Sequence, residues 1–207
     1  VGTPPEIRHT LLSLRREKRL LKIAERDVAF AISTKASGGT TVSATCLIAH
    51  QVGIHVFATG GIGGVHRGLD WDISADIKSL ASHPIIVVCA GIKSILDIPK
   101  TLELLEAASV PLISYASDYI ANFYCDRSSF LSPRRVDNVK QVADIFHVRK
   151  KLAQPEGMLL ANCLEKGLAI NAELFEEELA QGLKIAEAQK ISFQAVTPFL
   201  LAHLASK

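Results

Sequence analysis

The fold is decided by residues 85–93, which read IIVVCAGIK. An unbroken run of small and apolar residues predicts a strand buried on both faces, and such strands are typical of parallel sheets. Lys93 follows this run where the chain leaves the carboxyl edge of the sheet, and α/β proteins bind their ligands at that edge. Because a partly desolvated lysine amine can lose its proton and attack a carbonyl carbon, the stretch also predicts a nucleophile.

Apolar runs and helical periodicity extend this pattern in both directions along the chain. Further strands are predicted at Asp27–Ser33, Ile54–Ala58, Val110–Tyr115 and Met158–Asn162. Helices are predicted at Pro4–Glu25, Val42–Gln51, Ser74–Ala81, Ile95–Ala107, Val139–Lys151 and Ala172–Ala188, with an irregular segment at 116–136 and a short apolar tail from Pro198. Alternating strands and helices predict an α/β fold, an α/β/α sandwich with a largely parallel sheet covered by helices on both faces. No linker composition interrupts residues 1–207, so we expect a single domain.

The composition excludes several classes of partner. The chain has 207 residues, of which 48% are hydrophobic and 21% charged, with a formal net charge of +2. That composition is typical of a globular protein, and so small a charge argues against nucleic acid or a membrane surface as a general partner. No apolar run approaches the roughly 18 residues of a transmembrane helix, so no membrane span is expected.

Four cysteines, Cys46, Cys89, Cys125 and Cys163, are widely spaced and form no CxxC pair. Most of them fall in apolar runs, which indicates small core residues in a reducing compartment. We therefore expect an intracellular protein, most simply a cytoplasmic one. The start at Val1 shows neither an initiator methionine nor a signal-peptide pattern, which indicates a chain excised from something longer, or processed, and leaves an organelle open.

The segment Ser37–Thr41 places two glycines and three hydroxyl groups where a helix is predicted to begin. Backbone N–H groups at a helix N-terminus, together with the helix dipole, form an anion site, to which Thr40 and Thr41 would add hydroxyl donors. An ordinary capped turn between two elements fits as well, so both interpretations stay open. No Gly-Lys-Ser/Thr follows, and the segment is therefore not a nucleotide P-loop.

A second glycine cluster, at residues 59–68, reads TGGIGGVHRG. It fails as a dinucleotide fingerprint, because His66 replaces the last glycine of the GxGxxG pattern and no acidic residue follows at the expected distance. Glycines after a strand still allow the backbone to approach a ligand closely. His66 and Arg67 would offer that ligand a titratable group and a fixed cation, while a structural role for His66 stays open.

Asp72 and Asp76 are separated by four positions. On a helix this spacing places both carboxylates on one face, where they could hold a hard divalent cation with water completing its shell. The competing interpretation is that both acids lie at a helix start and complement its dipole. The spacing alone does not decide between them.

Four motifs, taken in order, resemble those of pseudouridine-5′-phosphate glycosidases. They read SGGTTV at 37–42, VFATGGIGGVHRG at 56–68, DISAD at 72–76 and VVCAGIKSILD at 87–97. The resemblance extends from about Lys22 to Leu201, and four long motifs in one order are far more specific than any one alone. It implies an α/β/α sandwich that assembles as a homotrimer.

The resemblance also implies an enzyme of nucleoside catabolism. Such a glycosidase reversibly cleaves the C–C bond of pseudouridine 5′-phosphate, giving uracil and ribose 5-phosphate, and depends on Mn²⁺. Lys93 matches the nucleophile that forms a Schiff base with C1′ of ring-opened ribose, and Asp72 matches the metal ligand. The expected substrate-binding residues are Lys22, Thr41, Val42, His66, Ser74, Ala75 and Asp76. Because a C-glycosidic bond has no leaving-group oxygen to protonate, an imine supplies the electron sink instead.

Two parts of the family pattern fall outside residues 1–207. The general-acid glutamate belongs to a segment upstream of position 1, and a substrate-side asparagine segment follows the TPFLL stretch at 197–201. The alternative is therefore an inactive or partial family member that binds sugar phosphate or acts in assembly. A nicotinamide-dependent oxidoreductase is disfavoured by the broken glycine pattern, and fusion to a sugar kinase stays open.

Overall fold

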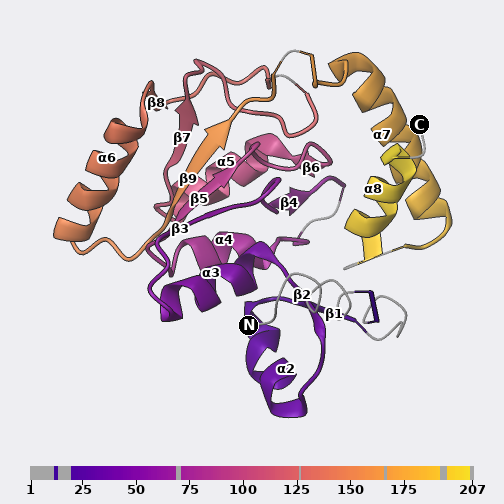
Figure 1. Cartoon of the computed structure of the whole chain (residues 1–207). Coiled ribbons are helices and arrows are strands. Elements are labelled where there is room, and N and C mark those ends of the chain that lie inside the picture. The colour runs from indigo at the N-terminus through magenta and orange to yellow at the C-terminus, as the bar shows by residue number, and fades with distance from the viewer. Residues whose placement is uncertain are drawn as a thin grey trace.

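A five-stranded parallel sheet forms the centre of the molecule (Figure 1). The computed structural model describes residues 12–13, 20–68, 71–125, 127–165, 167–191 and 195–205. In spatial order the strands are β3 (Val56–Ala58), β5 (Ile86–Cys89), β9 (Met158–Asn162), β7 (Leu112–Tyr115) and β8 (Arg135–Val136). Each neighbouring pair runs parallel. The predicted α/β fold and the four strands expected from residues 54–58, 85–90, 110–115 and 158–162 are confirmed.

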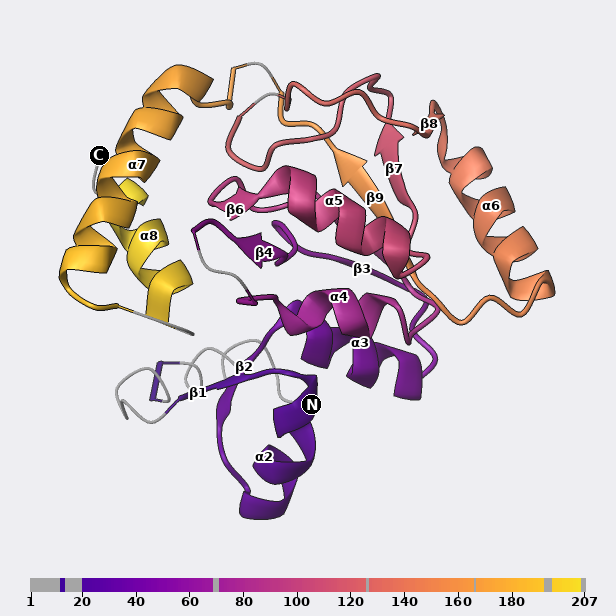
Figure 2. The same cartoon turned by 180° about the vertical axis from the view of Figure 1, so that it is seen from behind.

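Helices cover both faces of the sheet, as predicted. They are α3 (Val42–Gln51), α4 (Ala75–Leu80), α5 (Ile98–Ala107) and α6 (Val139–Lys151), whereas α7 (Ala172–Ala188) and α8 (Val196–Ala205) pack against each other to one side of the sheet (Figure 1 and Figure 2). Alternate residues of β5 point to opposite sides: Val87 joins the core cluster shared with α3, α4 and α5, whereas Ile86 packs with Phe146 of α6. In Figure 2, α5 crosses in front of the sheet and α6 lies beside β8. The apolar tail predicted from Pro198 is part of helix α8.

The strand predicted at Asp27–Ser33 is wrong. After a short 3-10 turn, η1 (Glu25–Asp27), the chain forms helix α2 (Val28–Thr34). The run is apolar, yet Phe30 is 61% exposed and only Ala31 of the helix is buried, so the composition does not report a buried strand. The helix ends at Lys35, whose φ of 54° is left-handed.

Most of the helix predicted at Pro4–Glu25 lies outside the described residues. Its C-terminal end is wrong, because residues 21–23 form strand β1 (Leu21–Ile23), which pairs in parallel with β2 (Gly38–Thr40). The turn predicted at Ser37–Thr41 therefore includes a short strand. In Figure 1 the β1–β2 pair and α2 form a unit beside the main body, next to α3.

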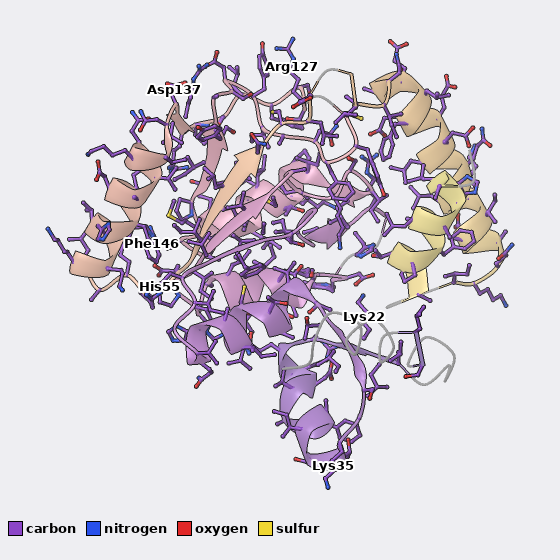
Figure 3. The ribbon with its side chains drawn as sticks, in the orientation of Figure 1. Lys22, Lys35, His55, Arg127, Asp137 and Phe146 are labelled. Atoms are coloured by element: carbon purple, nitrogen blue, oxygen red, sulfur yellow. The ribbon has the colours of Figure 1, made fainter. Side chains whose placement is uncertain are left out.

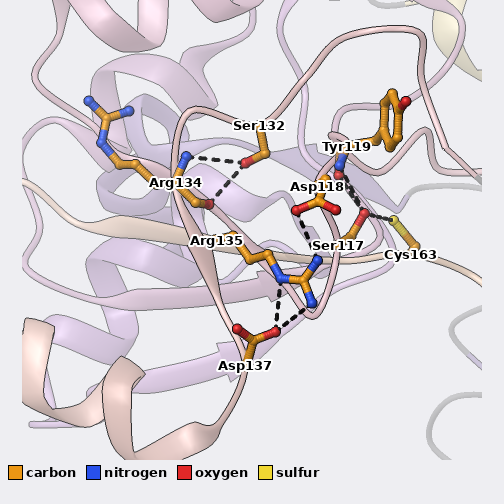
Figure 4. A network of polar contacts seen from close by, with 8 residues as sticks. All are labelled: Ser117, Asp118, Tyr119, Ser132, Arg134, Arg135, Asp137 and Cys163. Atoms are coloured by element: carbon orange, nitrogen blue, oxygen red, sulfur yellow. Dashed lines mark hydrogen bonds and ion pairs between the residues drawn. The ribbon is translucent and has the colours of Figure 1, made fainter.

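Where the structure describes it, the long segment 116–136 is irregular, as predicted, except for β8 at its end. At its surface, Arg135 pairs with Asp118 at 2.9 Å, near the start of the segment, and with Asp137 at 2.7 Å (Figure 4). Two short strands, β4 (Val65–His66) and β6 (Leu96–Asp97), form a separate antiparallel pair. β4 belongs to the second glycine segment, and β6 follows Lys93 in the chain. In the described part of the chain, no helix combines the length and apolar character that crossing a membrane requires.

Candidate active site

A cavity of about 830 Å³ opens where β3 and β5 end. Each residue predicted to act in catalysis, substrate binding or metal binding lines this cavity, although they come from several separate segments. They are Lys22, Thr41, Val42, His66, Asp72, Ser74, Ala75, Asp76 and Lys93. In Figure 3, Lys22 lies where β1 faces the main body of the molecule. The structure thus brings the whole predicted set together, while the role of each residue stays a prediction.

Lys93 is held by backbone contacts with the glycine segment. Its N–H donates to the carbonyl of Ile62 at 3.1 Å, and the N–H of Ile62 donates to the carbonyl of Gly91 at 3.1 Å. Burial lowers the pKa of the Lys93 amine and nearby Lys22 lowers it further, while Asp76 acts in the opposite direction. The net shift favours a neutral amine, which is the form that attacks a carbonyl carbon.

Two glycines of the 59–68 cluster approach side chains of the protein rather than a ligand. A Cβ added to Gly61 would overlap the ring of Phe123, and one added to Gly64 would overlap Thr101. Thr101 also accepts a hydrogen bond from the N–H of Val65 at 3.0 Å. The glycines therefore let the loop pack tightly, and this close packing places Phe123 in the cavity wall.

The two aspartates do not share a helix face, contrary to one of the two interpretations of their spacing. Helix α4 begins at Ala75, and Ser74 is its N-cap, accepting a hydrogen bond from the N–H of Asp76 at 3.2 Å. Asp76 lies in the first turn, where a carboxylate complements the helix dipole. Asp72 precedes the helix, and its Oδ2 is buried without a hydrogen-bond partner.

Asp76 is already engaged by the protein. Its Oδ1 accepts a hydrogen bond from the N–H of Ser43 at 2.9 Å, and its Oδ2 accepts one from the N–H of Gly63 at 2.8 Å. Among the described residues, no group of three or more His, Cys, Asp or Glu side chains is arranged to hold a metal ion. Any cation at Asp72 would therefore depend on water or substrate oxygens for most of its ligands.

His66 is fixed by α8. Its Nε2 lies 3.2 Å from the Oγ1 of Thr197, and its backbone N–H donates to the carbonyl of Asp72 at 2.9 Å. Burial lowers the pKa of the imidazole, and the charges of Lys22 and Lys93 lower it further against an opposing effect of Asp72. A neutral imidazole is consistent with a hydrogen-bonding role in the cavity wall.

The anion site expected at Ser37–Thr41 has few free backbone donors. The N–H of Thr41 donates to the carbonyl of Ile23 at 2.8 Å, and its Oγ1 lies 2.8 Å from the Oγ of Ser43. The cation expected at Arg67 is also committed elsewhere, because its guanidinium binds Glu176 at 2.6 Å. Lys22, Arg26 and the hydroxyls of Thr40 and Thr41 line this part of the wall.

Several residues of the cavity wall were not predicted as site residues, among them Ser43, Phe123 and Thr197. Ser43 follows the motif at 37–42 directly, and Thr197 opens the TPFLL stretch, so a wider reading of these motifs would have included both. Phe123 lies in the irregular segment 116–136, where no local pattern indicates a binding role.

Comparisons with known proteins agree with one another. A family profile described as "Indigoidine synthase A like protein" matches residues 3–207. A pseudouridine-5′-phosphate glycosidase of Myxococcus xanthus is 46% identical over 193 residues, which are 92% of this chain and 64% of that protein. One of Paracoccus denitrificans is 42% identical over 206 residues, or 99% of this chain and 67% of that protein. The chain thus spans about two thirds of the length of these relatives.

Two solved structures share the fold. The indigoidine synthase A-like protein of Thermotoga maritima superposes with a TM-score of 0.86 at 30% sequence identity. The match covers 94% of this chain and 64% of the Thermotoga protein. The prealnumycin C-glycosynthase AlnA, solved in complex with ribulose 5-phosphate, gives a TM-score of 0.84 at 35% identity, covering 90% of this chain and 62% of its own.

Proposed function

The chain belongs to the indigoidine synthase A-like family and is a homologue of pseudouridine-5′-phosphate glycosidases, and from this premise we propose that it acts on pseudouridine 5′-phosphate. The reaction is reversible cleavage of the C–C bond between uracil and ribose 5-phosphate. The observation that carries the proposal is Lys93, a partly buried lysine of lowered pKa in the wall of a cavity lined by the whole predicted site.

Lys93 acts as the nucleophile. Its neutral amine adds to C1′ of the ring-opened sugar, and loss of the aldehyde oxygen as water leaves an imine. Once protonated, the imine makes C1′ an electrophile, to which the uracil carbon adds in synthesis. That carbon then loses its proton, and the O4′ of the sugar closes the ring by displacing the Lys93 amine from C1′. In cleavage the electron pair of the C–C bond returns to that uracil carbon, which takes up a proton. The residue that delivers this proton is not assigned within residues 1–207.

The sugar phosphate binds beside β1 and the start of α3. Lys22 supplies the positive charge there, and the hydroxyls of Thr40 and Thr41 supply further donors. A charge-assisted contact of this kind contributes roughly 1.5–3 kcal/mol, so phosphate should improve binding at least about tenfold. We also propose that the chain assembles as a homotrimer, as the family resemblance implies.

Formation of pseudouridine 5′-phosphate from uracil and ribose 5-phosphate tests the function. The chain should make this product, detected by chromatography and mass, and should make at least about tenfold less of the unphosphorylated product from ribose at limiting sugar. Equal use of the two sugars would contradict the phosphate site. Imine formation without any product would instead favour the alternative, a partial family member that binds sugar phosphate.

A second candidate function is joining ribose 5-phosphate to another aromatic acceptor. The similarity to a structure named as a C-glycosynthase favours it. The same imine would serve, because only the carbon that attacks C1′ changes. Product formed with another aromatic acceptor, but none with uracil, would favour this function over the glycosidase.

Asp72 fits a Mn²⁺ ligand in one respect, which is the buried and unpaired Oδ2 of its carboxylate. Mn²⁺ accepts carboxylate, carbonyl and water oxygens, and the cavity leaves room for water beside this single acid. When bound, the ion would polarise substrate oxygens. The residues of the chain do the rest: Asp72 anchors the charge, and Lys22 and Lys93 contact the sugar phosphate.

Manganese should raise the melting temperature of the chain, and the rise should vanish in Asp72→Asn. A ligand at 100 times its Kd that binds only the folded state adds about 2.7 kcal/mol, or roughly 5–10 °C for a protein of this size. Scanning calorimetry with and without Mn²⁺ measures the shift. Asp144→Asn, which alters an exposed acid on α6, is the matched control and should keep the full shift. An equal shift in Asp72→Asn would remove the metal from this site.

A further inference from the structure

We propose that Asp76 is a positioning residue, whose carboxylate joins the start of α3 to the glycine segment and thereby fixes the place of Lys93. The resemblance assigns this position to substrate binding, whereas its contacts in the structure are with the protein. The inference deepens the proposed function and rests on it for the role of Lys93.

The carboxylate of Asp76 joins three segments of the cavity wall. It belongs to α4, its Oδ1 is bound by the N–H of Ser43 at the start of α3, and its Oδ2 is bound by the N–H of Gly63. Asp76 is 4% exposed and Ser43 is fully buried, so solvent does not compete for these hydrogen bonds. A buried carboxylate that accepts charge-assisted hydrogen bonds from two backbone N–H groups keeps those two groups at a nearly fixed distance from each other.

Gly63 transmits this constraint to the nucleophile. The residue before it, Ile62, accepts a hydrogen bond from the N–H of Lys93 and donates one to the carbonyl of Gly91, both at 3.1 Å. A Cβ at Gly63 would overlap Ser74 and would lie 2.9 Å from the Oδ2 of Asp76. The close approach of carboxylate and loop therefore requires glycine at this position.

The other end of the link is equally constrained. The Oγ of Ser43 accepts a hydrogen bond from the N–H of Glu25 at 3.2 Å, and its carbonyl accepts one from the Oγ of Ser79 at 2.9 Å. Ser43 therefore joins α3 to α4 and to the turn that follows β1. Lys22 lies on β1 itself. Through these bonds Asp76 connects the strand bearing one cavity lysine with the loop that holds the other.

Besides this positional effect, the charge of Asp76 raises the pKa of Lys93 and so disfavours its neutral, nucleophilic form. The amine is partly buried and lies near Lys22 and His66, and the charge of Asp76 raises its pKa against the effects of burial and Lys22. Removing that charge should lower the pKa of Lys93. The rate of imine formation should then reach half its plateau at a lower pH.

Two substitutions separate position from charge. Asp76→Asn removes the charge and one of the two acceptors, so the plateau rate of imine formation should fall by about 10²-fold and its pH midpoint should move down. Gly63→Ala breaks the same link while leaving the charge, so the rate should fall and the midpoint should stay. The readout is borohydride trapping of ribose 5-phosphate across pH. Asp97→Asn, at the N-cap of α5, is the matched control and should leave both quantities unchanged.

A substrate-contacting role predicts a different result. The ribose 5-phosphate concentration at half-saturation would rise at least about tenfold in Asp76→Asn, with the plateau rate kept, and that outcome overturns the proposal. Half-saturation should instead change less than about threefold in both variants. An unmoved rate and midpoint in Asp76→Asn would equally contradict the positioning role.

Hydrogen exchange of the unaltered protein gives a test that needs no variant to fold. The amides of Ser43 and Gly63 should exchange slowly, and saturating ribose 5-phosphate should leave them protected. Fast exchange of either amide, or loss of protection with the sugar, would overturn the proposal. This measurement also distinguishes failure of the positioning role from failure of the proposed function. The exchange rates of the two amides can be interpreted even if Lys93 traps no sugar.

Discussion

Replacing Lys93 by alanine should abolish covalent trapping of ribose 5-phosphate. In the unaltered protein, borohydride should reduce the imine and add the mass of the sugar to the peptide that contains Lys93. Burial lowers the pKa of this amine, so the neutral form is present at lower pH than for a free lysine, and trapping should rise with pH accordingly. Mass spectrometry of the digested protein gives both the extent and the position of labelling.

Control variants make this result specific. Lys93→Arg should trap nothing, because a guanidinium stays protonated and cannot form the imine. Lys78→Ala removes an exposed lysine of α4 and should leave labelling unchanged. Lys22 also lines the cavity, so an adduct that persists in Lys93→Ala and maps to Lys22 would overturn the assignment of the nucleophile.

The buried strands of the central sheet were predictable because their sequences are almost entirely apolar. The run at 85–90 is apolar at every position, and the structure buries β5 between α5 on one side and α6 on the other. The run at 28–32 looks similar but forms α2, with Ile32 73% exposed. Local composition cannot distinguish these cases, because burial depends on which elements meet in space.

The site was predictable to a different extent. The position of Lys93 followed from a general property of parallel sheets, in which chain segments leave the strands at one edge. The contacts of Asp76 could not be predicted, because its two backbone donors are 33 and 13 residues away in the chain. The same holds for His66, whose partner Thr197 is 131 residues away. Such long-range hydrogen bonds leave no periodic trace in a sequence.

Gly91→Ala should both destabilise the protein and impair Lys93. Gly91 has a φ of 102°, and an added Cβ would overlap the carbonyl oxygen of Ala121. Left-handed backbone costs a residue with a side chain about 1–3 kcal/mol, and overpacking a buried site typically costs a further ~1–3 kcal/mol. We expect the free energy of unfolding to fall by about 3 kcal/mol or more, measured by urea denaturation at equilibrium.

Gly53→Ala separates the two causes of that loss. Gly53 has a φ of 76°, also left-handed, but no atom lies within 4 Å of an added Cβ. Its substitution should therefore cost only the backbone term, about 1–2 kcal/mol, and should leave sugar trapping intact. Gly91 also accepts the hydrogen bond from Ile62 that anchors the loop beside Lys93, so its substitution should reduce trapping as well. Equal losses of stability in the two variants would show that contact with Ala121 costs nothing, and normal trapping in Gly91→Ala would separate the backbone of this turn from the reactivity of Lys93.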